Sequence, residues 1–264
     1  MTFSPFAFSG LILAATCLFL VFVIIKSARS RAHFIWAYFN ISVALWGVAS
    51  FFMLKDFGPE AALFWIRFGH CGVVFISVFF FHLVCLVCNL KRQKLIIFSY
   101  IQGCLFCVLL WTNFFITFDN VGIIFNEFYY DQSHGYIYPL FFTIWLGFIL
   151  YGHFELFKSY LFSKGIKRNQ ILYFFFGMVV GFSGGLTNFF PVFGLSLYPI
   201  GNFTIPIYCV IVSYAILKYQ LLDIRMAVTK TGIFVAVYSL VLGVPFAIAF
   251  LWQHNLIGIL GENW

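Results

Sequence analysis

The chain has 264 residues, of which 63% are hydrophobic, 23% aromatic and only 9% charged. Soluble domains carry roughly 25% charged residues, so this composition excludes an ordinary water-soluble domain. The formal net charge of +7 does not indicate nucleic acid, because the basic residues are grouped between long apolar runs, as membrane topology requires. We predict an all-α, polytopic transmembrane helical bundle whose first partner is the lipid bilayer.

Eight apolar runs each approach the ~20 residues that cross a bilayer. They predict about eight helices, at residues 5–25, 34–54, 61–87, 95–113, 137–157, 171–190, 196–217 and 231–252. No basic residues precede the first run, so we expect a retained helix and not a cleaved signal peptide. Pro199 and Pro206 interrupt the seventh run, where Gly201 adds a further point at which we expect the helix to bend.

The basic residues set the expected orientation, because cytoplasmic loops retain Lys and Arg. Of the 15, only Lys55 and Arg67 fall outside the connections that follow the first, third, fifth and seventh predicted helices. The acidic residues of the alternate connections and of the C-terminal tail are Asp56, Glu60, Asp119, Glu127, Asp131 and Glu262. We therefore predict that the N-terminus lies outside.

The connection at residues 115–136 is the one long loop, and the same rule puts it outside. It is rich in Phe, Tyr and β-branched residues, so we expect an ordered cap containing a short hairpin. In the predicted helix at 171–190, Gly177, Gly181 and Gly185 recur at four-residue spacing. This spacing predicts one small face against which another helix packs closely.

Arg67 and His70 lie one turn apart in the outer half of the 61–87 helix, and Trp65 precedes them. An ionisable pair inside a membrane span is a functional-site hypothesis. With Trp46, these residues form the predicted ligand-binding group, and replacing Arg67 with Ala should then abolish the response to ligand. The alternative is that Arg67 snorkels and pairs with Glu60 or a lipid headgroup.

A serine protease and a metal site are two further alternatives. The sequence GFSG at 181–184 matches the GxSG pattern of intramembrane serine proteases, but the only histidine after Ser183 is His254, at the outer end of the last helix. Two CxxC pairs, Cys85 with Cys88 and Cys104 with Cys107, lie at different depths without a nearby carboxylate. We expect no metal and no cofactor.

Three ionisable residues lie in the inner halves of two predicted helices: His82, His153 and Glu155. We expect them to have packing or interface roles and not to relay protons. His153 and Glu155 are two residues apart, so they face different directions on a helix. We therefore predict no catalytic residues.

Four stretches carry a family resemblance: GIKRNQ at 165–170, GGLTNFFP at 184–191, LYPIGN at 197–202 and, most specifically, YAILKYQLLDI at 214–224. Asn40, the ALW stretch at 44–46 and Arg67 add to it. Through these stretches, residues 5–225 resemble the N-terminal seven-helix sensor region of bacterial histidine kinases and related signalling proteins.

The resemblance implies a non-catalytic sensory module in a bacterial cytoplasmic (inner) membrane, formed by residues 1–225. It would receive an unknown small or lipophilic ligand and pass a displacement through the seventh helix. The implied relay residues are Pro199, Gly201, Pro206, Leu221 and Asp223. Residues 226–264 would add one helix and a short extracytoplasmic tail without an output domain, so we expect a homodimer or a separate cytoplasmic signalling partner.

A small-molecule transporter or channel subunit is the main alternative, and an intramembrane enzyme is the second. Transport predicts broken helices at corresponding positions in two halves of the chain, whereas only the seventh predicted helix is interrupted. No nucleic-acid partner is expected.

Overall fold

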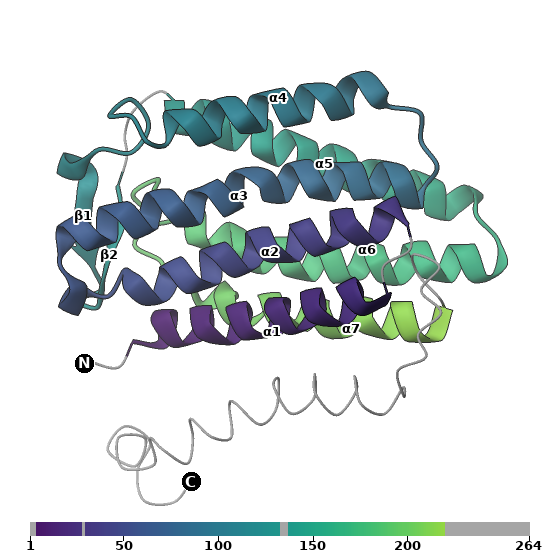
Figure 1. Cartoon of the computed structure of the whole chain (residues 1–264), viewed down its shortest axis with the longest axis horizontal. Coiled ribbons are helices and arrows are strands. Elements are labelled where there is room, and N and C mark those ends of the chain that lie inside the picture. Colours follow the sequence, from purple (N-terminus) through teal and green to yellow (C-terminus); the bar gives the residue numbers. More distant parts are fainter. Residues whose placement is uncertain (1–3, 28–29, 133–136, 220–264) are drawn as a thin grey trace, which may run out of the picture. The chain divides into compact units, whose positions relative to one another are not determined.

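The computed structural model describes residues 4–27, 30–132 and 137–219, which all belong to one compact unit, Met1–Arg225. Seven α-helices occur in this part of the chain (Figure 1): α1 (Pro5–Ser27), α2 (Arg31–Phe52), α3 (Pro59–Val87), α4 (Gln93–Leu109), α5 (Ile137–Phe162), α6 (Gly165–Leu186) and α7 (Ile205–Tyr219). The predicted all-α fold is confirmed. The predicted helix at 231–252 and two predicted relay residues, Leu221 and Asp223, lie outside the described residues.

Five of these helices, α1, α2, α3, α5 and α6, are long and apolar enough to cross a membrane. Helix α4 has 17 residues, the lower limit for a span. In lipid no water can bond to exposed backbone groups, so long apolar segments satisfy them internally as helices. Membrane spanning therefore follows from length and composition together.

The start of the seventh helix corrects the prediction. Helix α7 begins at Ile205 instead of residue 196, because the chain first forms an irregular segment and the 3-10 helix η4 (Ile200–Phe203). Pro199 and Gly201 therefore precede the helix, and Pro206 lies in its first turn, where a missing N–H costs no helical hydrogen bond. These residues do not bend α7, which runs without interruption through Tyr219.

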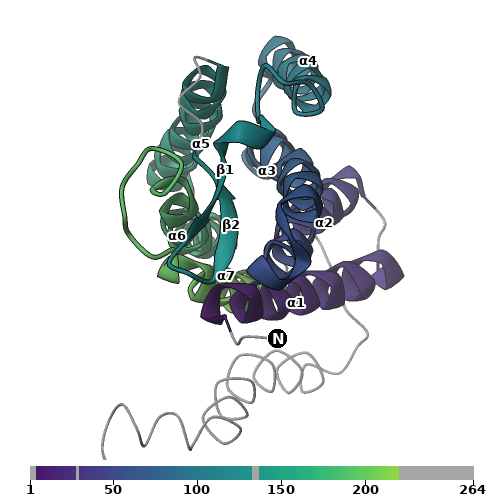
Figure 2. The same ribbon diagram turned by 90° about the vertical axis from the view of Figure 1, so that its left-hand side faces the viewer.

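The described helices form a ring with one helix outside it. Neighbours around the ring are α1, α2, α3, α5, α6 and α7, and α7 packs back against α1. Helix α4 packs on the outside of α3 (Figure 2). Only Ser99, Gln102, Gly103 and Phe106 of α4 are buried, whereas α2 buries residues along its whole length.

Small residues allow the ring helices to touch backbone to backbone. A Cβ on Gly47 of α2 would stand 2.6 Å from the Gly10 carbonyl oxygen of α1. The predicted glycine face of α6 is present in part: Gly177 and Gly181 pack against α7, but Gly185 has open space and Gly184 instead approaches the Gly201 carbonyl. The last close contact of α6 is thus with η4 and lies one residue before the predicted position.

The expected hairpin is also confirmed. Strands β1 (Val121–Ile124) and β2 (Phe128–Asp131) pair antiparallel across a turn in which Phe125 and Asn126 have positive φ, as the central residues of a type I′ turn require. Figure 2 shows the hairpin lying across one end of the ring. We call this the hairpin end. The chain segment between α2 and α3 joins it there, because Tyr129 N donates to Met53 O at 2.7 Å.

Candidate functional site

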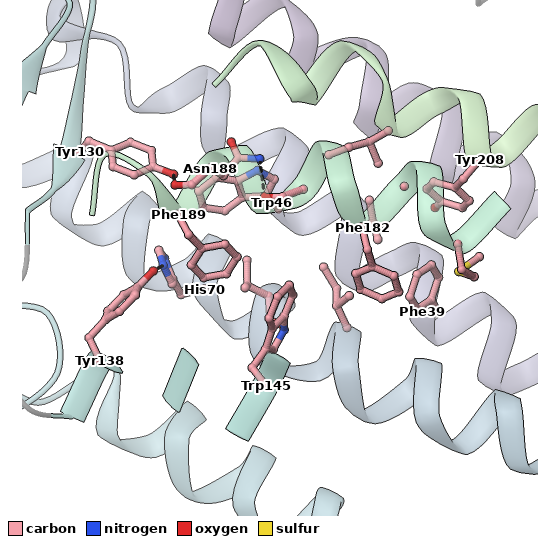
Figure 3. A pocket seen from close by; sticks show the side chains of 17 residues that line it. Phe39, Trp46, His70, Tyr130, Tyr138, Trp145, Phe182, Asn188, Phe189 and Tyr208 are labelled. Carbon is pink, nitrogen blue, oxygen red and sulfur yellow. Dashed lines mark hydrogen bonds between the residues drawn. The ribbon is translucent and has the colours of Figure 1, made fainter. Parts of the chain in front are cut away.

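A cavity of about 60 Å³ lies inside the ring. Every ring helix except α1 contributes to its wall, as does strand β2. Its lining is almost entirely aromatic and apolar, and Figure 3 labels ten of the residues: Phe39, Trp46, His70, Tyr130, Tyr138, Trp145, Phe182, Asn188, Phe189 and Tyr208. An apolar cavity with a few converging polar groups is the usual form of a small-molecule site.

His70 and Tyr138 form one polar group of this wall. His70 Nδ1 lies 2.8 Å from Ile66 O and Nε2 lies 2.9 Å from the Tyr138 hydroxyl. Because a carbonyl oxygen can only accept, the proton is assigned to Nδ1, and Nε2 of the neutral ring accepts from Tyr138. The buried imidazole is therefore held in one tautomer and one orientation.

Asn188 and Tyr130 form the second polar group. The Tyr130 hydroxyl donates to the backbone carbonyl of Asn188 at 2.6 Å, while the side-chain Nδ2 of Asn188 donates to Asn202 Oδ1 at 2.8 Å. Burial first, and the nearby Asp131 carboxylate second, raise the pKa of Tyr130, so its hydroxyl stays protonated and donates. The hairpin is thereby joined to the segment that connects α6 with α7.

Tyr208 connects α7 with the opposite side of the ring. Its hydroxyl donates to Asn40 Oδ1 of α2 at 2.9 Å and lies 3.3 Å from Cys17 Sγ of α1. The Tyr208 ring also packs against Gly181 of α6, where an added Cβ would be 3.0 Å from its Cδ1. One side chain on α7 therefore contacts three other helices and the cavity.

The four predicted ligand-binding residues divide into two pairs. Trp46 and His70 line the cavity, whereas Arg67 and Trp65 do not. Arg67 is bonded to the chain after α4, donating to Ile116 O at 2.6 Å and Asn113 Oδ1 at 3.2 Å. Arg67 thus has protein acceptors, in place of the Glu60 or headgroup partner proposed for a snorkelling arginine. Trp65 stacks on Phe52 with ring centroids 4.2 Å apart.

Three of the predicted relay residues, Pro199, Gly201 and Pro206, lie at the hairpin end, beside a group of polar contacts around Tyr198 and Glu127. Tyr198, next to Pro199, donates to Glu127 Oε2 of the hairpin turn at 2.8 Å and accepts from Phe6 N of α1 at 2.9 Å. Ser4 also donates to Glu127. Burial and the Glu127 carboxylate raise the pKa of Tyr198, which keeps this hydroxyl protonated as a donor.

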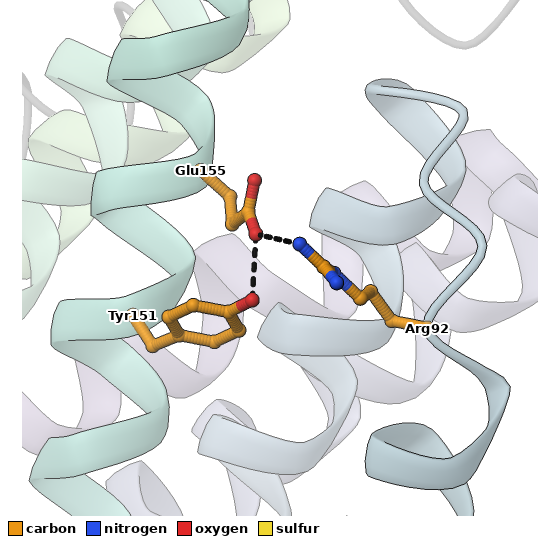
Figure 4. A network of polar contacts seen from close by, with 3 residues as sticks. All are labelled: Arg92, Tyr151 and Glu155. Carbon is orange, nitrogen blue, oxygen red and sulfur yellow. Dashed lines mark hydrogen bonds and ion pairs between the residues drawn. The ribbon is translucent and has the colours of Figure 1, made fainter.

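A third polar group lies at the end opposite the hairpin. Arg92, just before α4, forms an ion pair with Glu155 of α5 at 2.9 Å, and Tyr151 donates to the same carboxylate oxygen at 2.6 Å (Figure 4). Glu155 is 4% exposed but Arg92 is 44% exposed, so the pair lies at the boundary of the bundle. The group joins the start of α4 to the ring.

The alternative chemistries gain no support from the described residues. The exposed Ser183 hydroxyl donates to Val180 O on its own helix. All seven cysteines are free, and no group of three or more metal-ligating side chains occurs in the part of the chain that the structure describes. His82 bonds Tyr100, and His153 bonds Ile149 O.

A family model described as the N-terminal 7TM region of histidine kinase matches residues 10–225. The chain belongs to this family. It is therefore a histidine-kinase-associated sensory input region with membrane-spanning helices, and signal transduction is the process it serves. No curated protein and no solved structure matches it.

Several cavity residues of this histidine-kinase sensor region were missed in the sequence. Tyr138, Trp145 and Tyr208 stand among 14 tyrosines and seven tryptophans, and periodicity does not single them out because these helices are apolar on every side. Asn188 carried a signal, because a buried amide in an apolar helix needs a partner. It lies inside the GGLTNFFP stretch that supported the resemblance.

Proposed function

We propose that the chain is the ligand-receiving input module of a membrane receptor, without catalysis of its own. In this proposal residues 1–225 form the sensor, the hairpin end faces outside a bacterial cytoplasmic membrane, and α7 carries the signal toward a cytoplasmic output domain or partner, or a second copy. Residues 226–264 would add a further helix and an outer tail. The orientation is supported by the separation of charge: Lys91, Lys164 and Arg168 lie in or beside connections opposite the hairpin, and Asp119 and Glu127 lie at the hairpin.

One observation carries the proposal: the cavity wall includes the contact between α6 and α7. Phe182 and Tyr208 both line it, and Tyr208 rests on Gly181. A molecule that presses on Tyr208 therefore acts on α7 directly. Because Tyr208 is also bonded to Asn40, a shift of α7 has to break or remake a contact with α2, which favours two discrete positions over a continuous slide.

The test joins residues 1–225 to the cytoplasmic part of a bacterial histidine kinase and measures autophosphorylation in membrane vesicles. Gly181→Leu places a side chain where Tyr208 packs, so we expect it to fix α7 in one position and change the basal rate at least fivefold in either direction. Gly181→Ala, which adds one methyl group, should give a smaller change of the same sign. Folding is checked by thermal unfolding of each variant.

Gly147→Leu is the matched control, because the Gly147 Cβ direction on α5 is open and lies away from the cavity. It should leave the rate unchanged. If folded Gly181→Leu and Gly147→Leu both phosphorylate at the wild-type rate, α7 does not carry the signal and the proposal fails.

A further inference from the structure

The cavity differs in polarity between its two ends. Toward the hairpin end, its wall carries Trp46, His70, Tyr130, Tyr138 and Asn188. Phe39, Phe182 and Tyr208 lie toward the other end (Figure 3). The Tyr208 hydroxyl at that end is already bonded to Asn40. Such a wall suits a molecule with a polar head toward the hairpin and an apolar remainder toward the ring interior.

Most polar atoms at the hairpin end already have partners. Both ring nitrogens of His70 are bonded, the hydroxyls of Tyr130 and Tyr138 both donate, and Trp145 Nε1 donates to Val73 O at 2.8 Å. These groups shape the wall, but their hydrogen bonds are already made, so they do not select a ligand.

Two buried polar atoms of the wall have no partner among the described residues: Trp46 Nε1 and Asn188 Oδ1. Trp46 is 4% exposed and Asn188 6% exposed. The Asn188 amide cannot simply be reversed, because its nitrogen also donates to Gly185 O at 3.2 Å, and a carbonyl oxygen can only accept. Buried polar atoms are normally hydrogen-bonded, so each unpartnered atom needs an explanation.

The residues that carry these two atoms both lie beside Tyr130. The Trp46 and Tyr130 ring centroids are 6.3 Å apart, and the Tyr130 hydroxyl bonds the Asn188 backbone at 2.6 Å. Tyr130 thus lies against Trp46 and bonds Asn188, so the two residues with unpartnered atoms line the same end of the cavity.

The required head group follows from its hydrogen bonds. Trp46 Nε1 needs an acceptor and Asn188 Oδ1 needs a donor, and a hydroxyl supplies both. A carboxylate supplies no donor and meets no cation among the described lining residues, because Arg67 does not line the cavity and its guanidinium is bonded to Ile116 O. An ether or ketone leaves Asn188 unpartnered.

We propose that the cavity binds an uncharged, hydroxyl-bearing amphiphile of the aliphatic alcohol class, with its hydroxyl between Trp46 and Asn188 and its chain toward Phe182 and Met178. This inference deepens the proposed function. Binding of the alcohol does not depend on that function, but the effect of binding on kinase output rests on it. A chain longer than the present cavity admits must push on Phe182 and Tyr208, the side chains at the α6–α7 contact.

The test uses the full chain in lipid nanodiscs and a photoreactive diazirine analogue of hexan-1-ol, with labelled residues located by mass spectrometry. The competitors are hexan-1-ol, its isomer 1-methoxypentane, and hexanoate. The first two share one formula, but the ether accepts without donating. We expect labels on Met178 or Phe182, displaced by hexan-1-ol at a concentration at least tenfold lower than the ether requires, and no displacement by hexanoate.

Two variants separate the roles of the two atoms. Asn188→Leu removes the acceptor and should abolish the preference for the alcohol over the ether. Trp46→Phe removes the N–H donor that both compounds use, so it should weaken both by a similar factor and retain the preference. Trp111→Phe, an exposed tryptophan outside the cavity, is the control and should change neither. Thermal unfolding of each variant verifies that it is folded.

Equal displacement by alcohol and ether would overturn the hydroxyl assignment while leaving the cavity as a ligand site. Labelling confined to lipid-facing residues would also overturn the proposal, and would mean that water fills the polar end of the cavity. If the alcohol binds as expected but Gly181→Leu leaves kinase output unchanged, the inference stands and the proposed signalling role fails.

Discussion

Helices α2 and α4 both pack against α3, but different contacts hold them. Between α2 and α3 the backbones touch, because Gly72 offers no Cβ where the Ser42 carbonyl lies. Helix α4 presents Gly103 to the side chains of Phe75 and Val78, and most of its apolar surface stays exposed. Without a hydrophobic force between helices in lipid, close packing of small residues is what holds α2 in the ring.

Helix α4 is instead fastened near its two ends. Arg67 of α3 holds the chain after its last turn, and Arg92 with Glu155 holds its first turn. The two arrangements have different consequences: the ring should resist local change, whereas α4 should open at one end without unfolding the ring. Substitutions at Gly47, Arg67 and Glu155 test that difference.

The largest effect is expected where ring backbones touch. Gly47→Leu forces a side chain onto the Gly10 carbonyl of α1, and neither backbone can move without separating the helices. We expect a loss of about 3 kcal/mol of unfolding free energy. Equilibrium unfolding in mixed micelles measures it, with Gly147→Leu as a control that should cost little. A loss equal to the control would show that backbone contact does not hold the ring.

An intermediate effect is expected at the hairpin end of α4. Arg67→Ala removes the donors to Thr112 O, Asn113 Oδ1 and Ile116 O. The local loss should be about 2 kcal/mol, so amides of residues 112–116 should exchange hydrogen roughly 30-fold faster while ring amides do not change. Arg67→Lys keeps the charge but loses the forked guanidinium donors, so its exchange rate should lie between those of the wild type and Arg67→Ala.

This variant also separates the two hypotheses for Arg67. If Arg67 binds ligand, as the sequence suggested, Arg67→Ala should abolish labelling by the diazirine alcohol. If it only fastens the chain after α4, labelling of Met178 and Phe182 should persist while exchange at 112–116 increases.

The smallest effect is expected at the other end of α4. Glu155→Gln removes the charge that Arg92 pairs with but retains the shape and a hydrogen bond. Because Arg92 is half exposed, the loss should be only about 1 kcal/mol, with exchange of the first hydrogen-bonded amides of α4, residues 96–99, roughly fivefold faster. Lys91→Ala, at an exposed site beside it, should change nothing. Faster exchange throughout the ring would mean that α4 is not an independent unit.

The sequence predicted some elements of the fold better than others. The α2 and α3 spans, the hairpin and a small-residue contact on α6 all follow from local composition, since each depends on residues close together in the chain. The start of α7 was misplaced, because a hydropathy window counts Pro199 and Gly201 as part of an apolar run, although the chain uses them in an irregular segment before the helix.

The candidate site was predicted only in part, and Arg67 and His70 show why. They are one turn apart, yet His70 points to Tyr138 in the ring and Arg67 points to the segment after α4. In a helix surrounded by apolar residues, spacing alone does not tell which face meets protein and which meets lipid. Trp46 and Trp65 divide between the cavity and the outer surface for the same reason.

Composition and charge placement alone therefore determined that this chain lies in a membrane as a bundle of helices, and motif stretches near its second half indicated its family. These properties follow from the chain's interaction with lipid and water, which each segment makes by itself. Only the tertiary structure decided that α4 lies outside the ring and that Trp46 Nε1 and Asn188 Oδ1, beside one cavity, have no partner in the described part of the chain. A partner is a property of two distant segments, and only packing brings them together.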